Sequence, residues 1–110
     1  MRASFETWET WIGRINGRIV ASVRARLVDD VWDIGRLMVA VDVEGRGIGR
    51  ALLAFIEGQA PASAEAYELF TGARSERNQR MYALAGYQIL GPSEIPGAVR
   101  LRKVRPADSA

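Results

Sequence analysis

The chain has 110 residues, which suits one domain and leaves no room for a second of ordinary size. It contains no cysteine and no histidine, which excludes thiolate nucleophiles, imidazole bases, disulfides and Cys/His zinc sites. Its net charge of +2 is too small and dispersed for a nucleic-acid-binding surface, and we recognise neither a membrane span nor a signal peptide. We therefore expect a cytoplasmic protein without nucleic-acid or membrane partners.

The first part of the chain predicts three antiparallel strands. Asn16-Gly17 separates two β-type runs, 10–15 and 18–27, and both turn residues tolerate the positive φ of a type I′ hairpin. In the second run, alternate apolar residues are expected on one buried face: Ile19, Ala21, Val23, Ala25 and Leu27. After the Asp29-Asp30 turn, a third strand is predicted from Val31 to about Val41, and its last five residues are apolar on both faces, as in a central strand.

The hydrophobic period changes from two to 3.6 after the glycine-rich stretch 44–49, which predicts a helix ending between Gly58 and Pro61. Its expected apolar stripe comprises Ile48, Ala51, Leu52, Phe55, Ile56 and Gln59. Further strands are predicted at 67–71, 87–90 and 99–104, and a second helix from an N-cap at Ser75 to Ala85, ended by Gly86.

These elements predict an α+β fold in the order strand, strand, strand, helix, strand, helix, strand, strand. The unit from Val31 to Thr71 should be a right-handed parallel crossover, and the remaining pairs antiparallel, giving a mixed sheet. We expect an irregular segment at 1–9, one domain at 10–105 and a frayed tail at 106–110.

Gly45, Gly47 and Gly49 stand where a buried strand passes into a helix, a context that favours an anion site. Glycines let backbone amides approach a phosphate closely, and a helix N-terminus supplies unpaired N–H groups. The sequence Arg50-Ala51 lacks the Lys-Ser/Thr of a Walker A loop, and the spacing fails the Gly-x-Gly-x-x-Gly dinucleotide pattern. Considered alone, the glycines are also compatible with a tight connection that binds nothing.

The stretch 44–49 resembles the acyl-CoA-binding signature of GNAT-superfamily N-acetyltransferases, in which Arg or Gln is followed by two residues, Gly, one residue, and Gly or Ala. Here it reads Glu-Gly-Arg-Gly-Ile-Gly. A second block, 69–87, is similar to the family in its Asn78, its Tyr82 four residues later and its terminal Gly-Tyr. The resemblance covers about 10–104 and implies a GNAT-like sheet.

Two departures from the family pattern affect the expected site and assembly. Glu44 replaces Arg or Gln, so diphosphate binding should weaken unless Glu44 points to solvent or pairs with Arg46 or Arg50. The usual N-terminal strand and two helices are missing before the hairpin. Their absence predicts an apolar sheet face that needs a partner, as in a homodimer, an exchange of elements or a fragment of a larger protein.

The resemblance implies direct transfer of an acetyl group from acetyl-CoA, as co-substrate and without a metal, to an amine on a small molecule or peptide. It implies that Leu37 and Val39 lend backbone groups to pantetheine and acetyl, that the amides of Arg46, Gly47, Gly49 and Arg50 hold the diphosphate, that Asn78 contacts the CoA arm, and that Tyr82 protonates the departing thiolate. Asp33 and Glu68 are the strand-borne candidates for a general base, and neither is favoured over a solvated charge.

Three alternatives stay open at this stage. Without the resemblance, Tyr82 would be interpreted as a half-buried aromatic side chain that only packs against its neighbours, and Asn78 could form hydrogen bonds with nearby backbone groups. The whole domain could be a catalytically degenerate acyl-CoA-binding or interaction module, as Glu44 and the short N-terminus suggest. A generic phosphate or nucleotide binder is the third candidate, against which the failed Walker and dinucleotide spacings argue.

Overall fold

The computed structural model describes residues 8–106, which form one six-stranded sheet and two α-helices in the predicted order. The elements are β1 (Glu9–Ile15), β2 (Arg18–Val28), β3 (Val31–Val39), the 3₁₀ helix η2 (Val41–Val43), α1 (Ile48–Gly58), β4 (Ala66–Gly72), α2 (Glu76–Leu84), β5 (Gln88–Pro92) and β6 (Ala98–Val104). The sheet order is β1-β2-β3-β4-β6-β5, and only β3 and β4 are parallel, which confirms the expected mixed α+β fold. Most of the segments 1–9 and 106–110 lies outside the described residues.

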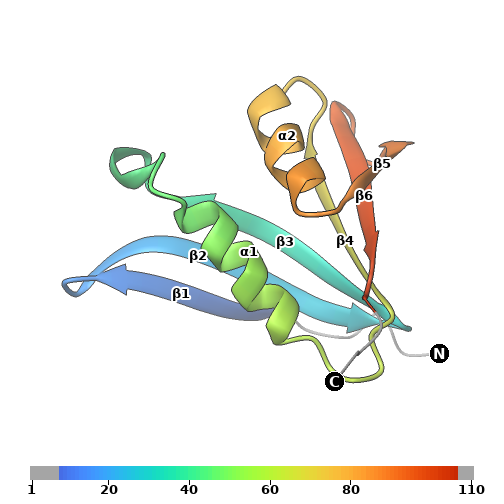
Figure 1. Ribbon diagram of the computed structural model, residues 1–110, viewed down its shortest axis with the longest axis horizontal. Coiled ribbons are helices and arrows are strands. Elements are labelled where there is room, and N and C mark those ends of the chain that lie inside the picture. Colours follow the sequence, from blue (N-terminus) through green and yellow to red (C-terminus); the bar gives the residue numbers. More distant parts are fainter. Residues whose placement is uncertain (1–7, 107–110) are drawn as a thin grey trace.

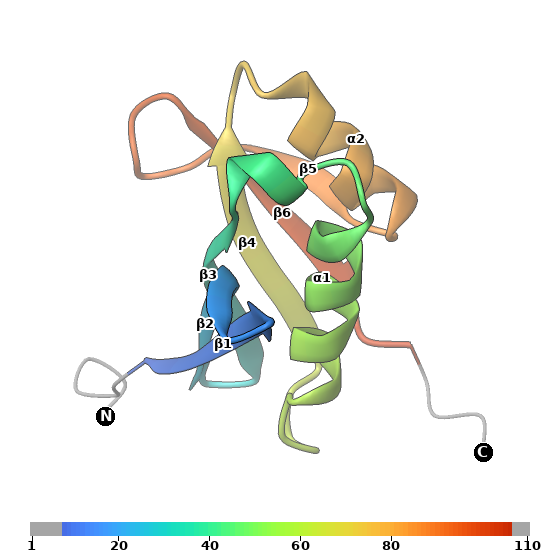
Figure 2. The same cartoon turned by 90° about the vertical axis from the view of Figure 1, so that its left-hand side faces the viewer.

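Both helices lie on the same face of the sheet, α1 over β1 to β3 and α2 over the β4–β6 half (Figure 1, Figure 2). The core lies between these layers, where Leu53 and Ile56 of α1 are almost fully buried. The predicted stripe of α1 is partly wrong: Ala51, Phe55 and Gln59 are exposed, whereas Leu53, which the stripe omits, is buried. The side of α1 that carries Leu53 and Glu57 faces Ala85, at the end of α2, and Lys103 of β6. These contacts bury a different side of the helix from the one that the predicted stripe marks. Neither helix within residues 8–106 is long and apolar enough to cross a membrane.

Local turn chemistry explains the hairpin, but not the strand register. Asn16 and Gly17 have φ values of 52° and 81°, as the predicted turn requires. The β1–β2 register shifts between Gly13 and Arg14, which leaves Val20 as the extra residue. Both Val20 and Ala21 are consequently buried and Ile19 is 51% exposed, so the expected core position of Ile19 is wrong.

A second irregularity interrupts β3. Gly35 pairs with Arg24 and Met38 with Ser22, so β3 contains one more residue than β2 between these pairs. Arg36 has a φ of 51°, the left-handed conformation that a β-bulge accommodates. The strand then ends at Val39 instead of the predicted Val41, because the chain turns into η2.

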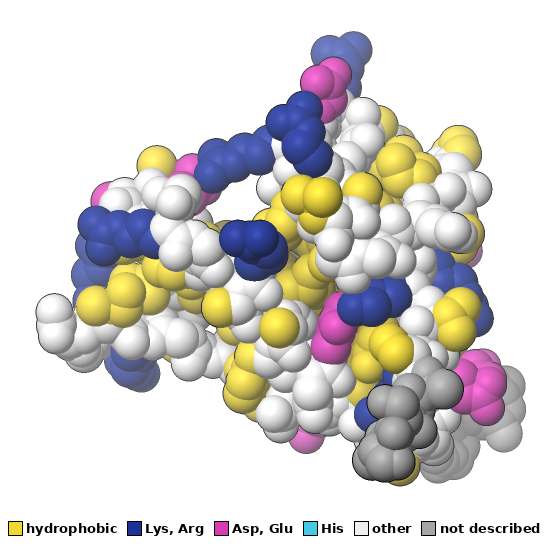
Figure 3. Space-filling model, in the orientation of Figure 1, with side chains coloured by type: hydrophobic (Ala, Val, Ile, Leu, Met, Phe, Trp, Pro, Cys, Tyr) yellow, Lys and Arg dark blue, Asp and Glu magenta, His cyan; other side chains and the backbone are white. Residues whose placement is uncertain are grey.

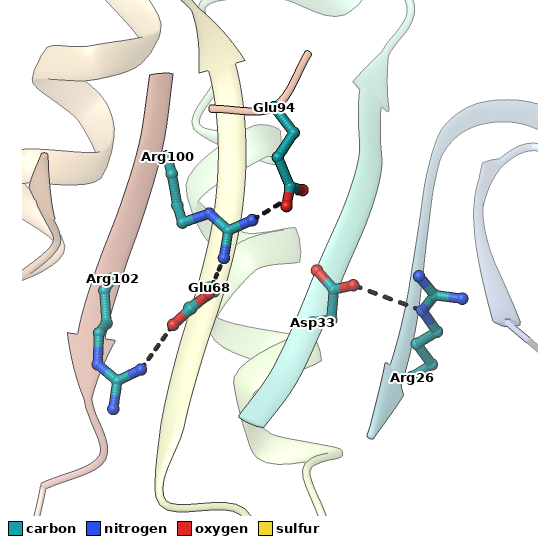
Figure 4. A network of polar contacts seen from close by, with 6 residues as sticks. All are labelled: Arg26, Asp33, Glu68, Glu94, Arg100 and Arg102. Carbon is teal, nitrogen blue, oxygen red and sulfur yellow. Dashed lines mark hydrogen bonds and ion pairs between the residues drawn. The ribbon is translucent and has the colours of Figure 1, made fainter. Parts of the chain in front are cut away.

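The sheet face opposite the helices carries a cluster of charged side chains on β2, β3, β4 and β6, where an apolar face was expected. Asp33 lies 3.4 Å from Arg26, and Glu68 accepts hydrogen bonds from Arg100 at 2.9 Å and Arg102 at 2.6 Å (Figure 4). Alternation along each strand sends these side chains away from the helices. No helix covers this face within residues 8–106 (Figure 2). This charged cluster therefore gives no support to a homodimer formed through a bare apolar face.

Candidate functional site

The site begins where β3 and β4 separate. Their parallel pairing covers only three pairs, from Val31–Ala66 to Asp33–Glu68, and stops before the bulge at Arg36. Beyond this point the strands diverge, and a cleft of about 430 Å³ opens between β3, the start of α1 and α2. It is lined by Leu37, Met38, Val39, Val43, Glu44, Gly45, Gly47, Ile48, Gly49, Arg50, Arg77, Asn78, Met81 and Tyr82.

The β3 wall offers backbone groups as well as apolar side chains. Met38 and Val39 pair with β2 on one side, while the β3–β4 ladder has already ended on the other. The apolar run at the end of β3 thus faces a cleft instead of a neighbouring strand, and Met38 is 59% exposed. Unpaired strand-edge groups are ready donors and acceptors for an extended ligand.

The second wall is the turn into α1. Gly45 and Gly47 have φ values of 85° and 78°, and a Cβ on either would meet nothing within 4 Å. The first bond of the helix runs from the N–H of Ala51 to the carbonyl of Gly47, and no acceptor among residues 8–106 takes the N–H groups of residues 45–50. Unpaired donors of this kind, together with the positive end of the helix dipole, are chemically suited to holding an anion. Basic side chains surround the adjoining hollow (Figure 3).

The third wall is α2, whose Asn78 and Tyr82 lie one turn apart and both line the cleft. Ser75 occupies the predicted N-cap position, but its side chain makes no capping bond. Instead, the side-chain amide of Gln79 donates to the carbonyls of Gly72 at 2.9 Å and Ala73 at 3.0 Å. This contact ties α2 to the end of β4 and so fixes the wall in place.

Tyr82 is 5% exposed, and burial raises its pKa above the ordinary value, so the phenol keeps its proton at neutral pH. Its ring packs edge-on against Tyr87 at a centroid distance of 5.9 Å. The Tyr87 hydroxyl donates to Glu57 at 2.7 Å, and the Lys103 ammonium donates to the other oxygen of that carboxylate at 3.0 Å. No hydrogen bond to the Tyr82 hydroxyl occurs within residues 8–106, which leaves this group available to a ligand.

The carboxylates lie differently from the sequence expectations. Glu44 pairs with Arg77 at 3.6 Å, and not with Arg46 or Arg50, the two partners that the sequence suggested as able to offset its charge. Asp33 and Glu68 do not line the cleft; they lie on the opposite sheet face among arginines. Burial, only partly offset by Arg26, raises the pKa of Asp33. In the described cleft lining, Glu44 is the only carboxylate.

The structure brings most of the predicted site residues together. Seven line the cleft, namely Leu37, Val39, Gly47, Gly49, Arg50, Asn78 and Tyr82, whereas Arg46 is exposed beside it and is not part of the lining. Sequence reasoning missed Met81. For Arg77, in the basic start of the second helix, it favours a solvated charge over a contact with the phosphates of CoA. The helical spacing of Met81 from Asn78 could have revealed it, but the contact of Arg77 with Glu44 has no local sequence signal.

Residues 1–87 match a family described as the acetyltransferase (GNAT) family. No curated protein matches the sequence significantly. Among solved structures, a Klebsiella pneumoniae protein assigned as an acyl-CoA N-acyltransferase is similar, with 22% identity, a TM-score of 0.79, and coverage of 89% of this chain and 72% of that one. A GNAT family acetyltransferase of Elizabethkingia anophelis with acetyl-CoA bound gives 19% identity, a TM-score of 0.77, and coverage of 89% and 76%. The PaiA N-acetyltransferase of Thermoplasma acidophilum, in complex with coenzyme A, gives 10% identity, a TM-score of 0.75, and coverage of 94% and 65%. At these identities, the structural likeness establishes the fold.

Proposed function

The chain belongs to the acetyltransferase (GNAT) family, which places it among the acyltransferases, and from that premise we propose that it transfers an acetyl group from acetyl-CoA directly to an amine. The single observation that carries the proposal is the cleft between β3, the start of α1 and α2, which opens where β3 and β4 cease to pair and has unpaired amides along its α1 wall. The amine is one carried by a small molecule or a peptide.

The residues present fit the carrier. The N–H groups of Arg46, Gly47, Gly49 and Arg50 would hold the diphosphate, and Arg50 also belongs to the cleft lining. Backbone groups of Leu37 and Val39 would pair with the pantetheine arm, whose contacts Asn78 would complete from α2. When bound, acetyl-CoA supplies an activated acetyl group on a thioester.

Tyr82 is the residue that we propose as the proton donor. Its raised pKa keeps the proton in place until a stronger acceptor forms nearby. Burial disfavours the negatively charged thiolate of departing CoA just as it disfavours the phenolate of Tyr82. The cleft therefore raises the proton affinity of both groups. A backbone N–H near Val39 would polarise the thioester carbonyl. The attacking amine must be neutral, and an α-amine with a pKa of about 8 meets that need more easily than a lysine-type amine near 10.4.

Acetyl transfer can be tested by thiol release. The chain contains no cysteine, so a thiol-reactive dye reports free CoA without a protein background. We expect amine-dependent thiol release with acetyl-CoA and a panel of α-amines, polyamines and peptides. Acetyl-CoA binding by calorimetry with no turnover on any amine would instead support a catalytically degenerate binding module, which the carboxylate of Glu44 in the cleft favours. Absence of acetyl-CoA binding would refute the proposal.

We also propose that the protein is a cytoplasmic homodimer. In place of a bare apolar face, support comes from the two sheet edges, where Ile15 of β1 and Ile89 and Leu90 of β5 are between 41% and 55% exposed. Light scattering should give twice the monomer mass. A stable monomer at high concentration would contradict this part of the proposal.

A further inference from the structure

Two oppositely charged side chains face each other across the mouth of the cleft. Glu44 precedes the glycine turn, Arg77 lies in the first turn of α2, and both belong to the cleft lining. The carboxylate of Glu44 lies 3.6 Å from the Arg77 guanidinium, and the side chains are 42% and 71% exposed. The contact therefore joins the two walls between which the carrier would enter.

We infer that Glu44 and Arg77 form an electrostatic clasp that competes with the diphosphate of the carrier, and that Glu44 thereby sets the affinity of the site for its phosphate-bearing end. The inference rests on the proposed function, because it assigns regulation of affinity to the same cleft. In the free protein Arg77 is held by Glu44. When the carrier binds, the diphosphate takes the place of the carboxylate beside Arg77.

Charge and exposure support this exchange. The described lining carries two cations, Arg50 and Arg77, and one anion, Glu44, so the clasp occupies half of the cationic side chains that face a polyanionic ligand. An ion pair this exposed is weak and separates at little cost, whereas a diphosphate offers more negative charge than one carboxylate. A clasp of this kind lowers affinity without blocking entry.

Calorimetric titrations with CoA and with pantetheine, which lacks the phosphates, test the clasp. Glu44→Gln should bind CoA about fivefold more tightly at low ionic strength, since repulsion and competition are both removed. In the Arg77→Ala background, the same substitution should gain about twofold or less, because no cation is left to release. Pantetheine affinity should not change. The gain should shrink at about 0.5 M salt, where the screening length is only a few ångströms.

Glu76→Gln is the matched control, because Glu76 is an exposed carboxylate next to Arg77 that does not line the cleft. It should leave CoA affinity unchanged. Equal gains from Glu44→Gln with and without Arg77 would show simple repulsion and overturn the clasp, as would an equal gain from Glu76→Gln. Wild-type binding of CoA with no change in Glu44→Gln would also overturn the clasp while leaving the proposed function intact. If no variant bound CoA, the proposed function and the clasp would fail together.

Discussion

Substitutions of Gly49 test how much space the cleft leaves beside the start of α1. It is the second residue of α1, and a Cβ added there would lie 3.5 Å from the Met81 sulfur and 3.8 Å from a methyl carbon of Val39, which is ordinary van der Waals contact. Alanine therefore fits, and removing a glycine from a helix is worth up to about 1 kcal/mol. Gly49→Ala should raise the free energy of unfolding by about 0.5–1 kcal/mol and the melting temperature by about 3–5 °C.

The Gly49→Val variant should still fold but should bind CoA more weakly. Its two methyl groups extend about 1.5 Å beyond a Cβ that already touches both walls, so they must enter the cleft beside the Gly49 amide or push Met81 aside. We expect Gly49→Val to lose about 1–2 kcal/mol of stability and to weaken CoA binding at least about tenfold. Gly49→Ala should weaken binding about threefold or less.

Circular dichroism melts and calorimetric CoA titrations measure the two effects. Ala51→Val is the control, because it adds a β-branched residue to the same helix at an exposed position outside the cleft lining. It should lose a few tenths of a kcal/mol and keep wild-type CoA affinity. A folded Gly49→Val variant with wild-type CoA affinity would refute the placement of the carrier in this cleft.

Three further predictions concern single side chains. Tyr82→Phe should lower kcat about 100-fold while the Kd for acetyl-CoA stays within about twofold, and an unchanged kcat in steady-state assays would remove Tyr82 as the proton donor. Glu57→Gln should lower the free energy of unfolding by about 2 kcal/mol in urea titrations, since Glu57 and Lys103 are only 15% and 19% exposed and the ammonium would lose its charged partner; a loss below about 0.5 kcal/mol would contradict this. The raised pKa of Asp33 means that the folded state holds this proton more tightly than the unfolded chain, so wild-type stability should improve relative to Asp33→Asn as the pH falls from 7 to about 4, and the opposite trend would contradict the burial of that carboxyl.

The elements that the sequence predicts correctly depend on local chemistry. The Asn16-Gly17 hairpin follows from two residues that tolerate positive φ, and the bounds of α1 follow from a glycine turn and a change of hydrophobic period. The cleft residues follow from two blocks of family resemblance, each of which lies on the expected element. Their assembly around one cavity agrees with that resemblance, while their individual roles stay predictions.

The incorrect predictions concern features that depend on packing between segments far apart in the sequence. The bulge that turns Ile19 outward depends on the β1–β2 register, which the alternation within β2 alone does not reveal. The charged sheet face has no signal in the individual strands, because Glu68 meets Arg100 and Arg102 only once β6 lies next to β4. The contact between Glu44 and Arg77 likewise depends on how closely α2 approaches the turn before α1.

Amide chemical shifts of uniformly labelled protein during an acetyl-CoA titration test the central claim most directly. Unpaired N–H groups at the start of α1 should respond most when they donate hydrogen bonds to the phosphate oxygens. We predict the largest saturable shifts at residues 45–50, followed by residues 37–39, with little change on the charged face around Glu68. Shifts that are absent from residues 45–50 at saturating acetyl-CoA, or that concentrate on the opposite face of the sheet, would contradict the account.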